Sequence, residues 1–426
     1  MRRRLMTLGA VTAGALLSLQ PLLSQQDELR TRAHRLHHDA LVLDTHADLT
    51  PFIEKDTLPA LITSPGMAAP GYDPAVDADR QPVLPTDGWY RTFPPGPWRF
   101  PERHTDGYMD LPRMREGGLD AEFFSVYMEN EPRPGMAVRR ALDQIEAIHA
   151  LCAKYPKDIA LAMRAADVRD IVRSGRIAAL IGVEGGHMIE DDMRALRMFS
   201  TLGVRYMTLA HAFNTNWADS AGVGPPVTPR HHGLSPFGRA VVEEMNRLGM
   251  LVDISHVADD TFYAALAVTK APVIASHSAC RGVKNHPRNL SDDMLRALAG
   301  NGGVIQIDAV TKYINPAIPV DLVPRSYTDM QNQPPEPPTP LSIFIDHIVH
   351  AIKVAGPDHV GIGLDYGYGV PAPVGLEDAS KLEAITYELL ARGVDEATVR
   401  KVLGENTLRV MLEAEQVAAR LQSAQP

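Results

Sequence analysis

Eight short apolar segments recur along this chain of 426 residues, and amphipathic stretches with helical periodicity separate most of them. Continuous apolar strands that alternate with such helices indicate a parallel sheet that is covered on both faces. Eight units of this kind predict an α/β protein whose sheet closes into a (β/α)8 TIM-type barrel, with an open, doubly wound sheet as the alternative. The expected strands are residues 41–44, 122–127, 178–183, 206–209, 251–254, 272–275, 304–307 and 360–364.

Two proline-rich segments interrupt the alternation of strands and helices. Residues 56–103 are dense in proline and glycine, and we interpret them as an insertion after the first strand that can cover the mouth of the barrel. A shorter proline-rich segment, residues 316–340, follows the seventh strand. For both segments, a surface loop that takes no part in the site is the alternative. We expect one barrel domain over residues 26–412 and a C-terminal tail over residues 413–426.

The N-terminus has the pattern of an export signal. Three consecutive arginines at residues 2–4 precede an apolar run over residues 8–19, which is shorter than the ~20 residues of a membrane span. A basic start followed by a short apolar run is typical of a secretory signal. The arginines resemble a twin-arginine signal, with a Sec signal or an uncleaved anchor as the alternative. We therefore expect residues 1–25 to direct export, and the mature chain to be periplasmic or secreted without a stable membrane span.

The composition excludes one class of function and leaves one disulfide open. The formal net charge of -10 argues against nucleic-acid binding, because contacts with phosphates need a basic surface. The two cysteines, Cys152 and Cys280, cannot form a disulfide framework, and whether they form one bridge is left open.

Polar side chains that can bind metal ions follow six of the expected strands. The carboxyl ends of the strands in a parallel barrel meet at one rim, where barrel enzymes place their active sites. One such residue alone is more simply a surface histidine or a helix cap, but six strand ends on one rim indicate a shared metal site. His46 and Asp48 stand two residues apart and therefore point to the same side of their strand. The other residues of this set are Glu184, His211, His256, His277 and Asp365.

The number of expected ligands predicts two metal ions. Histidine and carboxylate ligands without cysteine suit zinc, and also manganese or iron. Five ligands are too many for one catalytic ion that keeps a position open for water, but they fit two ions that one carboxylate bridges. Glu184 is the expected bridge, because its strand lies between the strands of the other ligands. The five expected ligands are His46, Asp48, Glu184, His256 and His277.

Six segments of the sequence resemble the membrane dipeptidase (renal dipeptidase) family. They are DTHAD, GVEGGH, RYMTLAHAFNTNWADS, VDISH, SHSACRGVKNHPRNLSDDMLR and HVGIGLDYG, and they extend over residues 44–367. A single motif such as HxD is weak, whereas the six segments together are highly specific. The resemblance implies a zinc-dependent dipeptidase of the metallo-dependent amidohydrolase superfamily, with two zinc ions in each subunit and a homodimeric assembly.

The resemblance also implies how the two zinc ions are held. His46 and Asp48 correspond to the ligands of one ion, and His256 and His277 to the ligands of the other. Glu184 corresponds to the bridging carboxylate, and thereby takes part in catalysis. The substrates implied are dipeptides with a free C-terminal carboxylate, whose peptide bond is hydrolysed by a metal-bridged hydroxide.

Three further residues acquire roles from the resemblance. His211 corresponds to the histidine that contacts the scissile carbonyl oxygen and the tetrahedral intermediate. Arg288 corresponds to the arginine that binds the C-terminal carboxylate of the substrate, and a guanidinium suits this task because its planar fork matches a carboxylate. Asp365 corresponds to the acid-base carboxylate that passes a proton to the leaving amine.

This chain departs from the family pattern at one point. Where members often read DFDG, it has Asp365, Tyr366 and Gly367, so the second aspartate is missing. The departure bears on substrate preference more than on catalysis, because the aspartate that is expected to transfer the proton is retained.

Two rival functions are compatible with the same residues. Another amidohydrolase-type hydrolase would act on lactones, cyclic amides or phosphotriesters, but such enzymes frequently bridge their metals with a carbamylated lysine. This chain has Glu184 after its third expected strand and no lysine at the end of its fourth. A periplasmic zinc-binding or peptide-binding protein without turnover is the alternative from another class, and the complete set of ligand and acid-base positions argues against it.

Five further histidines fall in segments that we expect to be helices or loops, and we interpret them as surface residues. They are His37, His38, His231, His232 and His286.

Overall fold

The computed structural model describes seven segments, residues 25–57, 98–104, 107–127, 135–223, 227–320, 336–367 and 370–424. The expected export signal lies outside the described residues except for its last residue. Residues 58–97 of the first proline-rich segment and residues 321–335 of the second also lie outside them. What the sequence predicts for these segments stays a prediction.

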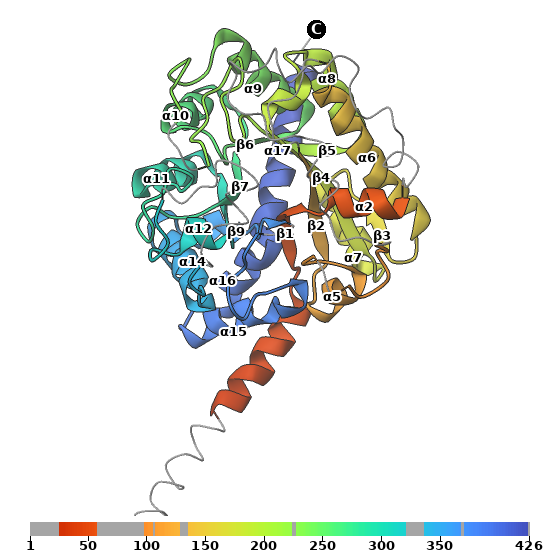
Figure 1. Ribbon diagram of the computed structural model, residues 1–426, viewed down its shortest axis with the longest axis vertical. Coiled ribbons are helices and arrows are strands. Elements are labelled where there is room, and N and C mark those ends of the chain that lie inside the picture. The colour runs from red at the N-terminus through yellow and green to blue at the C-terminus, as the bar shows by residue number, and fades with distance from the viewer. Residues whose placement is uncertain are drawn as a thin grey trace, which may run out of the picture.

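A single curled sheet of parallel strands forms the centre of the molecule (Figure 1). Its order is β10-β1-β2-β4-β5-β6-β7-β8-β9, and β3 pairs with β4 off this path. Each of the eight predicted strands overlaps an observed strand, and the predicted (β/α)8 TIM-type barrel is confirmed. The strands are β1 (Leu43–Asp48), β2 (Ala121–Tyr127), β3 (Ile159–Leu161), β4 (Ile177–Glu184), β5 (Val204–Thr208), β6 (Leu251–Asp253), β7 (Ile274–Ser278), β8 (Val304–Ile307), β9 (Val360–Ile362) and β10 (Tyr366–Gly367).

Two short strands, β9 and β10, occupy the position of the predicted eighth strand. β9 pairs with β8, and β10 pairs with β1, so the sheet returns to its first strand. Side chains of β1 satisfy backbone groups in the interval between the two strands. The Thr45 hydroxyl donates to the carbonyl of Ile362 at 3.1 Å, and the Leu364 N–H donates to Asp44 at 2.9 Å. Side-chain hydrogen bonds therefore complement strand pairing where the barrel closes.

The helices surround the sheet, and local signals in the sequence set their ends. α9 begins where the Ser235 side chain accepts a hydrogen bond from the Gly238 N–H, and it ends at Gly249, whose φ of 71° suits glycine. The helices are residues 25–39, α2 (Thr50–Thr57), α5 (Leu111–Glu116), α6 (Ala137–Lys154), α7 (Ala165–Arg173), α8 (Met193–Thr201), α9 (Pro236–Leu248), α10 (Asp259–Val268), α11 (Asp292–Asn301), α12 (Thr311–Ile314), α14 (Leu341–Ala355), α15 (Glu383–Ala391), α16 (Glu396–Arg400) and α17 (Asn406–Ser423).

The C-terminal helix α17, the long blue helix at the centre of Figure 1, closes the amino-terminal end of the barrel. Its Leu408 and Met411 belong to a buried cluster that also contains Leu43 of β1 and Phe123 of β2. The helix continues to Ser423 with Ala414 and Val417 buried. Residues 413–423, which we predicted as a tail, are therefore part of a packed helix, and the expected domain boundary at residue 412 is corrected.

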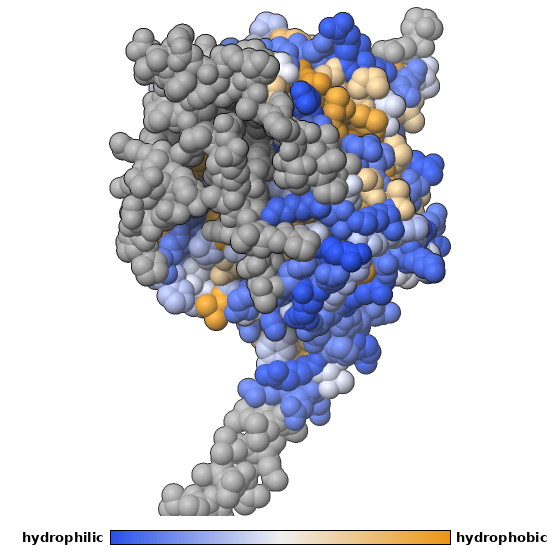
Figure 2. Space-filling view, turned by 45° about the vertical axis from the view of Figure 1, so that its right-hand side comes forward, coloured by the Kyte–Doolittle hydropathy of each residue, from blue (hydrophilic) through white to orange (hydrophobic). Residues whose placement is uncertain are grey.

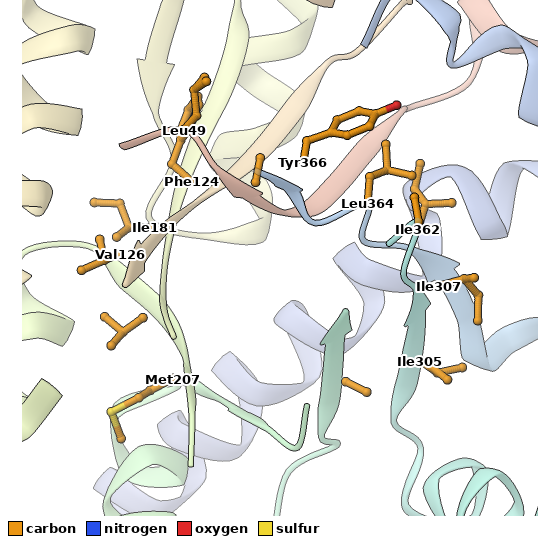
Figure 3. Close-up of a cluster of buried hydrophobic side chains, with 14 of the residues drawn as sticks. Leu49, Phe124, Val126, Ile181, Met207, Ile305, Ile307, Ile362, Leu364 and Tyr366 are labelled. Carbon is orange, nitrogen blue, oxygen red and sulfur yellow. The ribbon is translucent and has the colours of Figure 1, made fainter. Parts of the chain in front are cut away.

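A second apolar layer lies between the barrel and its helices. Phe124 and Val126 of β2 are two residues apart, as are Ile305 and Ile307 of β8, so each pair lies on one face of its strand. Both pairs are buried, and they point away from α17 (Figure 3). Burying each such side chain contributes about 1.5–3 kcal/mol. The outward face of the strands is thus used for packing, which leaves the carboxyl ends of the strands for polar residues.

The described surface in the view of Figure 2 is mainly hydrophilic, including the N-terminal helix (residues 25–39) that extends from the body. Among the helices of the described residues, none combines the length and the apolar character that crossing a bilayer requires. Cys152 and Cys280 are both free thiols in the structure.

We predict that Asp120 makes the stability of this fold depend on pH. Burial raises the pKa of Asp120 to about 6, against an unfolded value of 3.8, so folding disfavours its ionised form. The stabilisation from the protonated form is complete below pH 3.8 and is lost as the pH rises through about 6. Asp120→Asn retains an acceptor for the Val42 N–H and removes the charge. It should therefore raise the free energy of unfolding by about 1–2 kcal/mol at about pH 8 and by much less at about pH 4.

Denaturant unfolding of both proteins at the two pH values measures this difference, and Asp158→Asn, at an exposed ion pair with Arg115, is the control. An Asp120→Asn effect of equal size at both pH values would show that the charge is not its cause.

Candidate functional site

The predicted ligands meet at the carboxyl ends of the barrel strands. His46 and Asp48 lie on β1, Glu184 is the last residue of β4, and His277 lies on β7. His256 follows β6 after two residues. Parallel strands with a common direction therefore bring residues that are far apart in the chain to one rim, as the sequence predicts.

The Glu184 carboxylate lies at the centre of this group and is 3% exposed. Its Oε1 atom lies 3.0 Å from His256 Nε2, 3.2 Å from His277 Nε2 and 3.3 Å from His211 Nε2. Its Oε2 atom lies 3.7 Å from His46 Nε2. The two oxygens of one carboxylate thus face two different sets of side chains.

His46 and Asp48 form the second of these sets. His46 Nε2 lies 3.5 Å from Asp48 Oδ1 and 3.8 Å from Asp365 Oδ1. His46 Nε2 and Asp48 Oδ1 are buried, and neither has a hydrogen-bond partner among the described residues. A buried polar atom without a partner costs about 1–3 kcal/mol, so both atoms suit a bound ligand.

The donor atoms satisfy a distance test for metal binding. In the set of His46, Asp48 and Glu184, one ligand atom of each residue lies within 4.8 Å of the others, and the same holds for the set of Glu184, His256 and His277. Histidine nitrogens and carboxylate oxygens are ligands of zinc-type divalent ions. The residues present therefore fit two metal ions that share Glu184.

The protonation of Glu184, His256 and His277 also fits cation binding. Burial would lower the pKa of His46, but its interactions with Tyr206 and Glu184 outweigh burial and raise this pKa well above its ordinary value. Burial would raise the pKa of Glu184, but the charges of His211 and His46 and hydrogen bonds from His256 and His277 outweigh it and lower the pKa well below its ordinary value. Burial, together with nearby positive charges, lowers the pKa of His256 and of His277 well below the ordinary value of histidine. An ionised carboxylate and neutral imidazoles are the forms that bind metal ions.

Tyr206 holds the ring of His46. The Tyr206 hydroxyl lies 2.8 Å from His46 Nδ1 and donates to the carbonyl of Thr45 at 3.1 Å, so it accepts the proton of Nδ1. This leaves the Nε2 lone pair of His46 directed to the site. A Cβ atom at Gly182 would lie 1.9 Å from Tyr206 Cζ, so glycine at this position of β4 makes room for the ring.

A buried carboxylate orients His277 through a serine. His277 Nδ1 lies 2.8 Å from the Ser276 hydroxyl, which donates to Asp253 at 2.6 Å. Asp253 also accepts hydrogen bonds from the Ser255 N–H and the Thr208 hydroxyl. Such partners of ligand histidines fix the ring orientation and the tautomer. We did not predict Tyr206, Ser276 or Asp253 from the sequence; the signal for them was the presence of polar residues inside otherwise apolar strands.

Two residues of the site have left-handed backbone conformations that residues other than glycine rarely adopt. The φ angles are 64° at His256 and 56° at Asp365. Such conformations cost of order 1 kcal/mol and persist where surrounding contacts enforce them. At Asp365 the backbone N–H donates to the carbonyl of His46 at 3.0 Å, which ties this turn to β1.

Two glycines after Glu184 allow the loop of His211 to approach closely. A Cβ atom at Gly186 would lie 2.3 Å from Trp217, and one at Gly185 would lie 3.1 Å from the Cβ of His211. The Ser220 hydroxyl donates to the carbonyl of His211. The imidazole of His211 remains 15% exposed, so it faces both Glu184 and the solvent.

Asp365 has a carboxylate neighbour that we did not predict. Burial and the charge of Asp308 raise the pKa of Asp365 well above its ordinary value. Asp308 directly follows β8 and is buried, and burial raises its pKa to about 7. Asp308 follows its apolar strand just as the other site residues follow theirs, so the same rule could have identified it.

Arg288 lies beside the predicted histidine ligands rather than among them. It is 2% exposed, its Nη2 atom donates to the carbonyl of His277 at 3.0 Å, and its guanidinium stands 5.2 Å from the centre of the Tyr313 ring. Its Nε atom has no hydrogen-bond partner among the described residues. The guanidinium therefore has an unused donor next to the site.

Two histidines that we predicted at the surface are buried instead. His37 uses both ring nitrogens, with partners in Thr386 and the carbonyl of Gly117. The ring of His286 packs against Tyr313, and its Nδ1 accepts the N–H of Arg288. The predictions for His37 and His286 are wrong. The ring of His37 is hydrogen-bonded to segments that are distant in the sequence, and the ring of His286 is hydrogen-bonded within its own loop.

Comparison with known families shows which family the chain belongs to. The model of one family, described as membrane dipeptidase (peptidase family M19), matches residues 30–425. The chain belongs to this family. The family resemblance predicted from the sequence is confirmed, and this family member is a dipeptidase of a metallopeptidase family.

Individual members of the family support the same assignment. Dipeptidase verJ of Clonostachys rogersoniana is 38% identical over 324 residues, which is 74% of this chain and 78% of that protein. The probable dipeptidase PvdM from Pseudomonas aeruginosa has the same fold, with a TM-score of 0.73 and 22% identity over 92% of this chain and 100% of that chain. A metallo peptidase from Rhodobacter sphaeroides, solved with a phosphinate mimic of the dipeptide L-Ala-D-Ala, gives a TM-score of 0.65 and 24% identity over 88% of this chain and 99% of that chain.

We predict that Tyr206→Phe weakens metal binding in this family member without unfolding it. The ring and its packing over Gly182 remain, but the partner of His46 Nδ1 is lost. Loss of such a partner lowers metal affinity by about 10–100-fold. Competition with a chelator measures the change, and Tyr155→Phe, whose hydroxyl donates to Asp56 outside the site, is the matched control. Equal metal affinities for Tyr206→Phe and wild type would show that Tyr206 does not support His46.

Proposed function

We propose that this family member is a zinc-dependent dipeptidase with two zinc ions, one on each side of Glu184. The observation that carries the proposal is the division of the Glu184 oxygens, since Oε1 faces His256 and His277 and Oε2 faces His46. Histidine and carboxylate donors suit zinc as well as manganese or iron, and the resemblance to the family supports zinc. When bound, such a pair of ions would polarise a carbonyl group and supply ionised water at neutral pH.

Asp365 is the proposed acid-base residue. Its raised pKa keeps a proton on the carboxyl group at a higher pH than an ordinary aspartate, and this proton can pass to the amine that leaves when the peptide bond breaks. Its Oδ1 atom lies 3.8 Å from His46 Nε2, which supports this role. His211 is proposed to donate a hydrogen bond from its partly exposed ring to the oxygen of the scissile carbonyl.

Arg288 is the proposed binding group for the C-terminal carboxylate of a dipeptide. Its guanidinium is buried beside His277, so an ion pair with a substrate carboxylate would form where water is largely excluded. A carboxylate bound to the Arg288 guanidinium would lie beside His277, so the preceding peptide bond would lie near the proposed metal ligands. Internal peptide bonds have no carboxylate beside them, so this ion pair would favour the bond next to a free C-terminus, and the resemblance to the family supports the restriction to dipeptides. The dipeptide mimic in the Rhodobacter sphaeroides metallo peptidase supports this substrate class.

The residues after Asp365 bear on substrate preference. The hydroxyl of Tyr366 donates to the carbonyl of Leu376 at 2.9 Å, and its ring stacks on Tyr108. A Cβ atom at Gly367 would lie 3.3 Å from the Asp48 carboxylate. An aspartate in place of Gly367 would add a negative charge beside Asp48, so we propose that its absence here leaves the mouth less acidic.

We further propose that the mature chain is exported to the periplasm and acts as a homodimer. The arginines at residues 2–4 and the apolar run that follows support export. The resemblance to the family supports the dimer.

Hydrolysis of a dipeptide panel by zinc-loaded protein tests the proposed function. We expect turnover of dipeptides, and much weaker turnover of their C-terminal amides, of lactones and of phosphotriesters. Preference for a lactone or a phosphotriester would replace the proposal with another amidohydrolase activity, and no turnover of any substrate would favour a binding protein.

Arg288→Ala should raise the KM for dipeptides and change the KM for dipeptide amides little. The expected loss in kcat/KM is about 100-fold, as for a charged hydrogen-bonded pair of ~3 kcal/mol. Steady-state kinetics on both substrates measures it, and Arg296→Ala, at an exposed ion pair with Asp293, is the control. Equal losses for the acid and the amide would reject the carboxylate-binding role.

Asp365→Asn should lower kcat by about 100-fold or more while the metal content is unchanged, because the amide keeps the shape but cannot transfer the proton. Kinetics together with metal analysis of the same sample measures this effect. Normal turnover in fully loaded Asp365→Asn protein would rule out the proton-transfer role.

A further inference from the structure

A second cluster of possible metal ligands lies away from the mouth of the barrel. His34 and His38 stand four residues apart on the N-terminal helix (residues 25–39), so both project from one side of it. Glu383, the first residue of α15, faces them: its Oε2 atom lies 2.9 Å from His34 Nδ1 and 3.5 Å from His38 Nε2. One atom of each of the three residues lies within 4.8 Å of the others.

The local structure turns the two rings toward the carboxylate. The ring centres of His34 and His38 are 4.5 Å apart at an interplanar angle of 61°. The Nδ1 side of His38 lies against Gly118, where a Cβ atom would be 3.0 Å from that nitrogen, and Gly118 has a φ of 67° that disfavours a side chain. The Nε2 atom of His38 is thereby left to face Glu383.

The N-terminal helix is already held in place without this cluster. Ala33 and Leu36 are buried, and His37 is hydrogen-bonded on both ring nitrogens. Arg32 pairs with Glu396 at 2.5 Å. The three residues of the cluster thus face each other from elements whose relative position other contacts set, which is the arrangement that binds a metal ion with little reorganisation.

An ordinary ion pair explains the cluster less well. The side chains of His34, His38 and Glu383 are 65%, 35% and 37% exposed, and exposed ion pairs contribute about 0–1 kcal/mol. Such a pair needs one histidine, whereas two rings converge on a single oxygen here. Two imidazoles and one carboxylate form a ligand set of zinc-type ions that leaves the remaining positions to water.

We propose that His34, His38 and Glu383 bind one divalent transition-metal ion of the zinc type, separately from the site at the mouth. The ion joins the N-terminal helix to the start of α15. This helix leads into β1, which begins at Leu43, so the cluster lies toward the amino-terminal end of the barrel, where the helix leaves the body (Figure 1). Binding to the folded state alone stabilises the attachment of the helix.

The test is a titration of Zn²⁺ into the purified protein after its tightly bound metal has been counted. Wild type is expected to bind one further ion per chain, and His34→Ala and His38→Ala are each expected to weaken that binding at least about tenfold. His232→Ala, at an exposed histidine 3.9 Å from Asp260, is the matched control and should bind as wild type does. Dipeptide turnover should be unchanged in all three variants.

A second readout concerns the helix itself. Added Zn²⁺ is expected to slow hydrogen exchange over residues 25–39 in wild type, and not in His38→Ala. Binding of the further ion with equal affinity by wild type and by His38→Ala would overturn the proposal, because the ion would then be held elsewhere. Absence of a further ion in wild type would also overturn it and leave an exposed ion pair.

Discussion

The interaction on which the rest of the site depends is that of the Glu184 carboxylate with the imidazoles around it. A buried ionised carboxylate loses several kcal/mol of hydration free energy, which only nearby positive charge and hydrogen bonds can offset. Four imidazole Nε2 atoms lie within 3.7 Å of its two oxygens. The Tyr206 hydroxyl fixes the ring of His46 at its Nδ1 atom, and the Ser276–Asp253 pair fixes the ring of His277 at its Nδ1 atom. The mouth is organised to hold positive charge on both sides of one carboxylate.

The barrel provides this arrangement through the common direction of its strands. Apolar residues on the outward faces of the strands pack against helices, and α17 fills the amino-terminal end, while the polar side chains of the site gather at the carboxyl end. The strand position that completes the ring is divided into β9 and β10, and the turn between them carries Asp365 with a φ of 56°. The segment that closes the barrel therefore also carries the proposed proton donor.

Much of this could be predicted from the sequence, because apolar strands and the polar residues after them are local patterns. The eight strands and the convergence of His46, Glu184 and His277 follow from such patterns. β3, which pairs with β4 outside the main path of the sheet, was missed, and the division of the last strand depends on backbone angles that composition does not reveal. Tyr206 and Asp253 look like ordinary strand residues until their partners are known. His37 and His286 were assigned to the surface for the same reason, since burial of a single histidine depends on segments far along the chain or on the fold of its loop.

Anomalous X-ray scattering at the zinc edge, from crystals of zinc-loaded protein, would locate the metal ions relative to Glu184. We expect two peaks at the mouth of the barrel, one beside His46 and Asp48 and one beside His256 and His277, with Glu184 between them. A single peak at the mouth, or two peaks that Glu184 does not contact, would contradict it.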